Sequence, residues 1–319
     1  MKYVVYGAGA VGGVIGANLH RGGVDVTLVA RGAHLAAIRE RGLRLDSTLG
    51  STHVDVTAVA SAAEVEWTPD HVVLLCVKSH QTATALDDLA AHAPDTTPVV
   101  SVQNGVANER AILRRFARTY AVCVMLPSGH LEPGVVAQKC HPTPGILDVG
   151  RIPRGIDELT ETMAEDLRRG GFESVPRPDI MAWKYRKLIR NLGNGIDAVC
   201  APGDGVDDLA RLATAEGELV LAAAGIPAVT EAEDDERRGD ILRSTTGPWQ
   251  PGGSTWQSLR RGVGAVEIDY LSGEVVLLGR LHGVPTPVNE LLQRVTSELA
   301  RTGGEPRSLA AVDLLARVS

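Results

Sequence analysis

The chain has 319 residues, of which 44% are hydrophobic and 22% charged, and its formal net charge is -7. At roughly 100 to 200 residues per domain, this length predicts about two domains, and the apolar fraction is sufficient for a packed core. The composition excludes a disordered or collagen-like chain. Acidic residues outnumber basic ones by 39 to 32, which argues against a protein that coats nucleic acid or an anionic membrane.

The cysteines and the N-terminus carry no sign of a metal site or of export. No CxxC or Cys/His ligand spacing is present, so neither a metal centre nor a disulfide framework is expected. The six residues before Gly7 leave no room for the charged and apolar regions of a signal peptide. No apolar run approaches the roughly 18 residues that span a bilayer. We therefore expect a cytoplasmic protein with no membrane or nucleic-acid partner.

The first half of the chain alternates apolar strand candidates with helical segments. Strands are predicted over 3–6, 26–29, 71–77, 98–102 and 120–125, and helices over 11–20, 34–41, 82–92, 109–116 and 157–169. Continuous Val and Leu runs separated by helices are typical of a parallel sheet that is covered on both faces. The fold class predicted for this half is α/β, a Rossmann-type doubly wound parallel sheet.

The second half changes character at Pro176-Arg177-Pro178, which follows a short predicted strand over 172–175. Beyond these prolines the β-branched runs fade and helical periodicity takes over. Helices are predicted over 179–194, 207–224, 255–261, 266–282 and 286–301. We therefore expect a Rossmann domain, 1–176, and a second, mostly α-helical C-terminal domain, 177–319.

Two segments of the second half do not fit a regular helix pattern. The run 231–236 holds five acidic residues and is predicted to be a solvated helix end. The stretch 244–254 contains Pro248, Trp249 and three glycines, which predicts a loop. A tryptophan in such a loop is expected to wedge into a surface groove, with contact to a substrate as the alternative.

A glycine-rich motif follows the first predicted strand and opens the first predicted helix. Its residues are Gly7-Ala8-Gly9-Ala10-Val11-Gly12, which match GxGxxG. The first glycine permits a tight turn, the second lets backbone N–H groups approach a pyrophosphate, and the third lets the helix pack closely on the strand. The positive end of the helix dipole favours the phosphate charge. The six residues therefore predict a dinucleotide-binding turn.

The residue after the second predicted strand indicates which dinucleotide is bound. NAD-preferring sites place an Asp or Glu there, whose carboxylate accepts the 2′-hydroxyl of the adenosine ribose. In this chain Ala30 is followed by Arg31, whose guanidinium would pair with a 2′-phosphate. We therefore expect NADP (NADPH) as the cofactor, with a solvated loop charge as the alternative role of Arg31.

Polar residues also follow the third and fourth long strands, at Val77-Lys78-Ser79-His80-Gln81 and at Gln103-Asn104-Gly105. In doubly wound sheets, the loops at the carboxyl ends of the strands line the cofactor crevice. Lys78 and Asn104 are therefore predicted to face a ligand. A simple turn at Asn104-Gly105 is the alternative.

The second domain carries a polar stripe within the helix predicted over 179–194. On an ideal helix, Asn191 lies about 40° and Asn194 about 20° from Lys187, which places an ammonium and two carboxamides on one face. A solvated surface is the alternative. The nearby Gly193 and Gly195, each costing about 1 kcal/mol relative to Ala in a helix interior, make that alternative less favoured.

Taken together, these residues resemble the ketopantoate reductase (2-dehydropantoate 2-reductase) family, and the likeness covers nearly the whole chain. The motifs that carry it are the GxGxxG turn, Lys78, Asn104-Gly105, Lys187 with Asn191, Glu267-Ile268-Asp269-Tyr270, and Gly283-Val284-Pro285-Thr286-Pro287-Val288-Asn289. The resemblance implies an oxidoreductase of pantothenate biosynthesis. Its expected reaction is the NADPH-dependent reduction of a small-molecule 2-oxo acid, 2-dehydropantoate, to the 2-hydroxy acid pantoate.

The resemblance also implies roles for individual residues. Lys187 would be the general acid that protonates the developing alkoxide, and Glu267 the carboxylate that positions it. Lys184, one turn earlier, is the runner-up acid. The expected substrate and cofactor contacts are Asn104 and Asn191 on cofactor or substrate oxygens, Lys78 beside the cofactor, and either Ser254 or Thr255 at the substrate carboxylate.

The chain departs from the family pattern at two places. Family members usually carry a second Asn eight residues after the catalytic Lys, where this chain has Gly195, and Asn194 is the expected substitute. The region of Trp249 and Trp256 is also atypical. The alternatives are therefore a paralogue that reduces a different 2-oxo or carbonyl compound, and a non-catalytic NADP-sensing protein. The sequence is silent on oligomeric state and is compatible with a homodimer.

Overall fold

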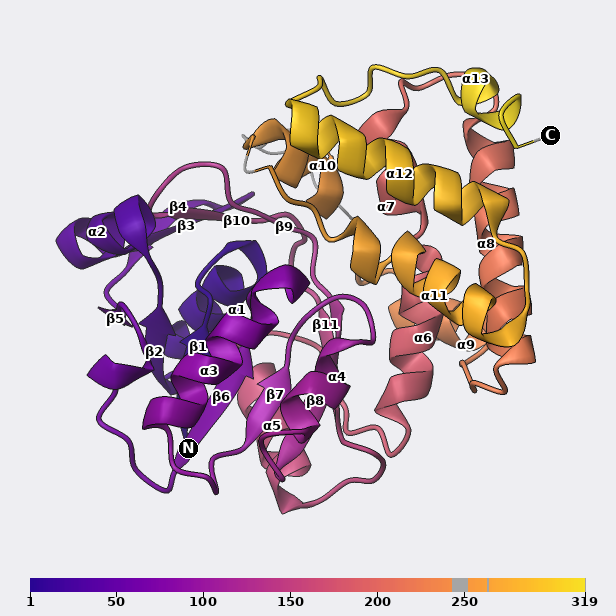
Figure 1. Ribbon diagram of the computed structural model, residues 1–319. Coiled ribbons are helices and arrows are strands. Elements are labelled where there is room, and N and C mark those ends of the chain that lie inside the picture. The colour runs from indigo at the N-terminus through magenta and orange to yellow at the C-terminus, as the bar shows by residue number, and fades with distance from the viewer. Residues whose placement is uncertain (243–251, 263, 319) are drawn as a thin grey trace. The chain divides into compact units, whose positions relative to one another are not determined.

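The computed structural model describes residues 1–242, 252–262 and 264–318, and they form two compact units (Figure 1). Trp249, about which a loop was predicted, lies outside the described residues. The chain enters the second unit more than once, so neither unit is one continuous stretch. The first unit is Met1–Gln103, Ala107–Met181 and Ala232–Trp249, and the second is Asn104–Val106, Ala182–Glu231 and Gln250–Ser319. The boundary predicted at residue 176 stays a prediction.

The first unit is built on a seven-stranded sheet of order β11-β8-β7-β6-β1-β2-β5. All neighbouring pairs are parallel except β8 and β11, which are antiparallel. In chain order this is the 3-2-1-4-5-6 arrangement of a Rossmann sheet with one extra edge strand, which confirms the predicted fold class. The strands are β1 (Lys2–Tyr6), β2 (Asp25–Val29), β5 (Thr57–Val59), β6 (His71–Leu75), β7 (Val99–Ser101), β8 (Thr119–Met125) and β11 (Ile146–Arg151).

Helices cover both faces of this sheet, as the apolar strands predicted. Alternate residues of β1 divide between two cores: Tyr3 and Val5 pack with residues of α1 and α5, whereas Val4 and Tyr6 pack with residues of α3 and α4. The helices of this unit are α1 (Ala10–Arg21), α2 (Gly32–Arg41), α3 (Thr82–His92), α4 (Asn108–Leu113), α5 (Glu158–Arg169) and α9 (Glu231–Arg238), with short 3₁₀ turns η1 (Ala62–Glu64) and η2 (Ser79–Gln81).

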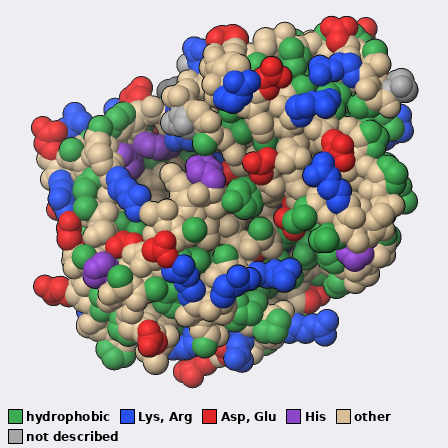
Figure 2. Space-filling view, in the orientation of Figure 1, with side chains coloured by type: hydrophobic (Ala, Val, Ile, Leu, Met, Phe, Trp, Pro, Cys, Tyr) green, Lys and Arg blue, Asp and Glu red, His purple; other side chains and the backbone are tan. Residues whose placement is uncertain are grey.

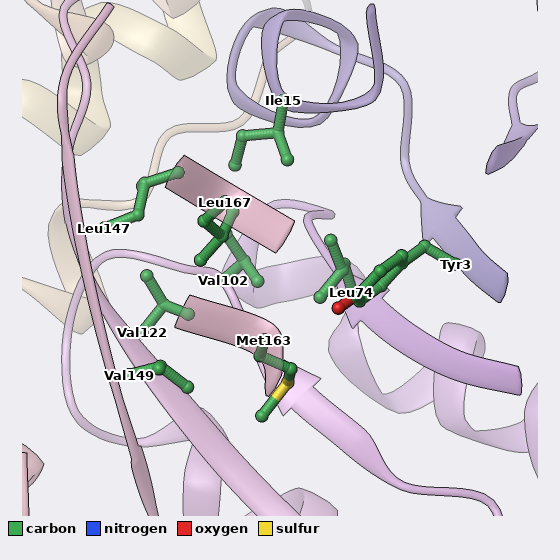
Figure 3. A pocket seen from close by; sticks show the side chains of 9 residues that line it. All are labelled: Tyr3, Ile15, Leu74, Val102, Val122, Leu147, Val149, Met163 and Leu167. Atoms are coloured by element: carbon green, nitrogen blue, oxygen red, sulfur yellow. The ribbon is translucent and has the colours of Figure 1, made fainter. Parts of the chain in front are cut away.

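A small pocket lies in the core between the sheet, α1 and α5 (Figure 3). Its walls are apolar, and the one hydroxyl among them, on Tyr3, donates to Asp166 at 3.0 Å. The pocket therefore belongs to the packing of the core rather than to a ligand site. The lining residues are Tyr3, Ile15, Leu74, Val102, Val122, Leu147, Val149, Met163 and Leu167.

A second sheet of four strands, which the sequence analysis did not predict, packs against α1. A Cβ added at Gly13 of α1 would lie 2.6 Å from the side chain of Val136 in this sheet, so the small residue allows the close approach. The strands are short, and half of them are two to four residues long, which explains why no periodicity revealed them. They are β3 (Leu43–Ser47), β4 (Gly50–Val54), β9 (Ser128–Gly129) and β10 (Val135–Gln138), in the order β4-β3-β10-β9.

Two expectations for the first unit need correction. Residues 172–175 form no regular strand; the segment makes isolated bridges to β11 at Glu173 and Pro176. The acidic run at 231–236 is helical but not wholly solvated, since Asp234 is fully buried and accepts a hydrogen bond from Arg238 at 2.6 Å. The prediction of a solvated end is therefore wrong for that side of α9.

The second unit is helical, as predicted, but two of its predicted helices are broken. The helix expected over 179–194 ends at Arg190, and the one expected over 266–282 begins only at Ser272, after the 3₁₀ turn η3 (Ile268–Tyr270). The α helices are α6 (Ile180–Arg190), α7 (Gly193–Val199), α8 (Val206–Ala223), α10 (Ser254–Arg260), α11 (Ser272–His282), α12 (Pro287–Thr302) and α13 (Ala311–Leu315). Among the described helices of both units, none has the length and apolar character needed to cross a membrane.

One carboxylate explains the motif around residues 283–289. Gly283, with a φ of +70°, ends α11, and Pro287 starts α12. Glu216 of α8 accepts the backbone N–H groups of Val288 and Asn289 at 2.8 and 2.9 Å. A carboxylate at a helix N-terminus satisfies unpaired N–H groups and the helix dipole, so this motif fixes the α11–α12 turn onto α8.

Candidate active site

Two of the three motif glycines are required by the backbone of the turn after β1. Gly7 has a φ of +106°, and a Cβ there would lie 2.9 Å from the backbone nitrogen of Val77. A Cβ at Gly12 would lie 2.2 Å from the carbonyl oxygen of Gly7. Neither position accepts a side chain, so the glycines let β1, the turn and α1 approach one another as the motif predicted.

Gly9 is different, because no packing requirement holds it as glycine. A Cβ at this position would meet no heavy atom within 4 Å in the described part of the chain. Gly9 is also the N-cap of α1, which has no side-chain cap and no acidic residue in its first turn. The N-terminus of α1 therefore presents backbone N–H groups and the positive end of the helix dipole. A side chain at residue 9 would cover these groups, and the glycine leaves them accessible to a phosphate.

Arg31 lies at the end of β2, where it is the N-cap residue of α2. Its guanidinium donates to the hydroxyl of Tyr6 at 3.3 Å, and this hydroxyl donates to Asp88 at 2.6 Å. Burial and the neighbouring carboxylate raise the pKa of Tyr6 to about 12, so the hydroxyl keeps its proton at neutral pH. The exposed Arg31 is therefore tethered by a buried tyrosine rather than moving freely in solvent.

His34 of α2 contacts the glycine turn and was not expected from the sequence. Its Nε2 lies 2.7 Å from the carbonyl oxygen of Ala8, and its Nδ1 accepts the backbone N–H of Gly134 at 2.8 Å. Because Nδ1 accepts, the ring is neutral with its proton on Nε2, and burial lowers the pKa of this histidine. His34 thus fixes the glycine turn to the second sheet. A lone histidine in a helix carries no sequence signal for such a role.

The turn that carries Lys78 is supported by a chain of buried polar side chains. Gln103 donates to Thr82 at 2.9 Å, Thr82 donates to Asn108 at 2.9 Å, and Asn108 donates to Ser79 at 3.1 Å. All four supporting residues are buried. Buried and bonded to one another, they hold the β6–η2 turn, and with it Lys78, in one conformation.

In the second unit, the structure brings Lys187, Asn104 and Asn191 together. The Nζ atom of Lys187 donates to the Oδ1 of Asn104 at 2.8 Å and to the Oδ1 of Asn191 at 3.4 Å. The Nδ2 of Asn191 donates to the same Asn104 oxygen at 3.3 Å. An amine is thus held by two carboxamides, one from Asn191, four residues on and directly after α6, and one from a loop 83 residues earlier in the chain.

The turn that begins at Glu267 packs on residues next to this cluster. A Cβ at Gly105, whose φ is +77°, would lie 2.7 Å from the carbonyl oxygen of Tyr270, and a Cβ at Gly195 would lie 3.0 Å from the Ile268 side chain. Glu267 itself is buried. Its charge favours the protonated form of the nearby Arg261, while burial lowers the pKa of that guanidinium. Arg261, unlike Glu267, was not expected from the sequence.

Asn194 does not lie on the helix face of Lys187, because the ideal-helix geometry stops at Arg190. A turn over 191–192 separates α6 from α7, and Asn194 lies in α7. Its Oδ1 would be 3.4 Å from a Cβ at Gly253, so it lies beside the start of α10. There Ser254 is half-buried, whereas Thr255 is 2% exposed. The expectation of one continuous polar stripe from 187 to 194 is therefore wrong.

Comparison with known families assigns the chain. The family model described as ketopantoate reductase PanE/ApbA matches residues 3–154, and its C-terminal counterpart matches residues 179–300. The chain belongs to the ketopantoate reductase family. A curated relative, the 2-dehydropantoate 2-reductase of Pyrococcus horikoshii, is 30% identical over 95% of this chain and 99% of its own. A second, from Halobacterium salinarum, is 30% identical over 95% of this chain and 100% of its own.

Solved structures resemble the chain over nearly its whole length. The ketopantoate reductase family protein of Ralstonia eutropha is 28% identical and superposes with a TM-score of 0.80, covering 95% of this chain and 99% of its own. A D-mandelate dehydrogenase, solved as a ternary complex with NADH and anilino(oxo)acetate, has the same TM-score and coverage at 23% identity. The second likeness concerns the fold alone.

Residue 195, where the family resemblance implies a second asparagine, lies beside the turn that follows Glu267. Gly195 is buried, and a side chain there would press on Ile268, directly after Glu267. A Cβ at this position would lie 3.0 Å from the end of the Ile268 side chain, which would have to shift by a few tenths of an ångström to make room. Asn194, one residue earlier, instead lies half-buried beside α10.

Proposed function

We propose that this protein reduces a 2-oxo acid to the 2-hydroxy acid with NADPH, and that 2-dehydropantoate, which gives pantoate, is its substrate. The observation that carries this proposal is the hydrogen-bonded cluster of Lys187, Asn104 and Asn191. An amine held by neutral amide oxygens suits the stabilisation of negative charge on a carbonyl oxygen. The names of the curated relatives supply the reaction class and the substrate.

In this mechanism Lys187 is the general acid. A nicotinamide held by the glycine turn would supply the hydride that adds to the carbonyl carbon of the substrate. The carbonyl oxygen then takes up the bonding electron pair, and Lys187 Nζ stabilises that charge and transfers a proton to it. Asn104 and Asn191 orient the amine. Glu267, buried directly before η3, positions Lys187. Lys184 remains the alternative acid, and its side chain is 3% exposed.

For the cofactor we propose NADP, with the pyrophosphate on the glycine turn and the 2′-phosphate on Arg31. The proposed cofactor-binding residues are Gly7, Ala8, Gly9, Ala10, Val11 and Gly12 of the turn, Arg31, Lys78 and Asn104. The absence of side-chain bulk at Gly9 and the tether of Arg31 to Tyr6 support this assignment. A guanidinium pairs with phosphate in a planar, bidentate geometry that a 2′-hydroxyl does not need.

On the substrate side, we propose that Asn191, Asn194 and Ser254 contact the 2-oxo acid. Ser254 is favoured over Thr255 because the threonine side chain is almost completely buried. The domain roles follow: residues 1–176 bind the cofactor, and residues 177–319 supply the substrate contacts and the acid.

A second candidate function is the reduction of a different 2-oxo acid by the same residues. It is favoured by Gly195, because a glycine supplies no carboxamide where the family resemblance implies a second asparagine. A non-catalytic NADP sensor is the third reading, and the ordered Lys187 cluster argues against it.

The experiment that separates these readings measures NADPH oxidation by the wild-type protein with a panel of 2-oxo acids. Turnover of 2-dehydropantoate with the highest kcat/KM supports the proposal. A higher kcat/KM for another 2-oxo acid supports the second candidate. NADPH binding without turnover of any compound contradicts both and supports the sensor.

A further inference from the structure

Arg307 has a backbone conformation that its residue type rarely adopts. Its φ is +58°, and among the described residues it is the one non-glycine with a positive φ. The left-handed region is disfavoured for residues with a Cβ, so such a conformation persists only where the surrounding contacts enforce it. The contacts of Arg307 therefore indicate what the strain maintains.

These contacts hold the loop of Arg307 against α7 and α10. The Nε and terminal nitrogen of Arg307 donate to the carbonyl oxygen and the Oδ1 of Asp197 at 3.1 and 2.6 Å. Its backbone N–H donates to the carbonyl oxygen of Ala198 at 2.9 Å. The guanidinium also lies over the ring of Trp256, 5.6 Å from its centroid. Arg307 thus contacts both the end of α7 and the first turn of α10.

Asp197 connects this grip to the start of α10. While its Oδ1 bonds Arg307, its Oδ2 accepts the backbone N–H of Gly253 at 2.9 Å. Gly253 immediately precedes Ser254, and a Cβ there would lie 3.2 Å from Asp197 and 3.4 Å from Asn194. The carboxylate therefore sets how closely the chain before Ser254 approaches Asn194.

Gly252 and Trp256 complete the arrangement. A Cβ at Gly252, whose φ is +145°, would lie 2.5 Å from the Trp256 ring, so the ring fits only against a glycine. Trp256 is 8% exposed. The tryptophan that departs from the family pattern is thus the surface on which Arg307 and the glycines before α10 meet.

The solvent exposure of the Arg307–Asp197 ion pair indicates that it positions the chain and adds little to the free energy of folding. The Arg307 and Asp197 side chains are 29% and 38% exposed. Ion pairs with such access to solvent contribute little to the free energy of folding. Yet Arg307 donates to both the backbone carbonyl and the Oδ1 of Asp197, the Oδ2 accepts from Gly253, and Arg307 keeps a disfavoured φ.

We propose that Asp197 and Arg307 are positioning residues that place Ser254 beside Asn194 and so set the affinity for the 2-oxo acid. This inference rests on the proposed function, in which Ser254 and Asn194 contact the substrate. It relates Asn194, Ser254 and Trp256 to one another: the Asn194 carboxamide and Ser254 can contact one substrate only if α10 starts at a fixed distance from residue 194. Neither Asp197 nor Arg307 acts on the reacting atoms.

The test compares three variants by steady-state kinetics with the 2-oxo acid of highest kcat/KM. Asp197→Ala removes both carboxylate contacts and is expected to raise KM about 10-fold, since loss of positioning weakens binding at the site. Asp197→Asn keeps an oxygen for the Gly253 N–H and is expected to recover most of that loss. Arg307→Lys loses the two-pronged grip on Asp197 and should give an intermediate KM. For all three, we expect kcat and the Kd for NADPH to stay within about twofold of wild type.

A matched control exists on the same two segments. Glu305 pairs with Arg260 of α10 at 3.5 Å, with both side chains well exposed. Glu305→Ala breaks that ion pair without touching Asp197, and KM should not change. Thermal unfolding of every variant is measured alongside, because a merely structural role would lower Tm and move kcat and the NADPH Kd together with KM.

The outcomes separate the failure of this inference from that of the proposed function. No turnover of any 2-oxo acid by the wild type overturns both. Turnover by the wild type with an unchanged KM in Asp197→Ala overturns the positioning role alone. If Asp197→Ala fails to fold, Asp197→Asn and Arg307→Lys decide: KM values equal to that of Glu305→Ala overturn the inference.

Discussion

The glycine turn of the first unit and the lysine cluster of the second are built in opposite ways. The turn is a property of backbone over six consecutive residues: Gly7 and Gly12 are fixed by contacts to main-chain atoms, and the helix that follows supplies the charge. The cluster is made of side chains from segments far apart, since Lys187 and Asn104 are separated by 83 residues. A local backbone motif identifies the class of cofactor, whereas the substrate depends on long-range contacts that vary with small shifts of the chain.

The largest expected effect is at the cluster. Replacing the amine in Lys187→Ala should lower kcat by about 10²-fold or more, because a general acid and its charge are lost together. The Kd for NADPH, measured by fluorescence titration, should stay close to wild type. Lys184→Ala is the matched variant in the preceding turn of α6, and a larger loss of kcat there would transfer the role of acid to Lys184.

The turn itself is tested by two alanines that differ only in the space available. At Gly12 the new Cβ would lie 2.2 Å from the Gly7 carbonyl, so Gly12→Ala should distort the turn, weaken NADPH binding at least 10-fold and lower the free energy of unfolding by about 1–3 kcal/mol. At Gly9 there is room for a methyl group. Gly9→Ala should therefore keep wild-type stability in thermal unfolding and lose only cofactor affinity. Unchanged NADPH binding in Gly9→Ala would contradict the proposal that the pyrophosphate binds at this position.

The preference for NADPH over NADH should change more on replacing Arg31 than on removing the Tyr6 hydroxyl to which Arg31 donates. Arg31→Asp places a carboxylate where the 2′-phosphate is proposed to lie, and the ratio of NADPH to NADH affinity should fall by roughly 10- to 100-fold, or about 1.4 to 2.8 kcal/mol. Tyr6→Phe removes only the hydroxyl that holds the guanidinium and should lower the same ratio a few-fold. A ratio that is undiminished in Arg31→Asp would mean that another residue reads the phosphate.

The smallest effect is expected from restoring the family residue at position 195. Because a Cβ there already approaches Ile268 at 3.0 Å, Gly195→Asn should cost about 1–3 kcal/mol of stability through overpacking rather than improve substrate binding. Chemical denaturation measures the first quantity, and KM for the 2-oxo acid the second. A lower KM at unchanged stability would show that the Ile268 side chain yields and that packing does not require a glycine at residue 195.

Most of the Rossmann unit could be predicted because its signals are local. The apolar run predicted over 71–77 contains the buried strand β6, His71–Leu75, and the glycine motif lies between a strand and a helix as expected. The second sheet was missed because strands of two to five residues, partly exposed as in Gly50–Val54, leave no period to detect. The antiparallel edge strand β11 was missed because no helix separates it from β8 in the predicted pattern.

The candidate site could be predicted in its residues but not in its geometry. Lys187 and Asn191 are one turn apart, so helical spacing alone placed them together. Asn194 was placed on the same face because the break after Arg190 has no strong sequence mark; two glycines lower helix propensity without specifying where the helix ends. His34, Asp197 and Arg307 were missed because each acts through a partner that only the folded chain brings near.

The central claim is that the Nζ of Lys187 meets the carbonyl oxygen that is reduced. A crystal structure of the protein with NADP and a slowly reacting 2-oxo acid tests it most directly. We predict a keto oxygen within hydrogen-bond distance of Lys187 Nζ, with Asn104 and Asn191 still bonded to the amine or to the ligand. A keto oxygen bound by Lys184, or a ligand that leaves Lys187 out of reach, would contradict this account.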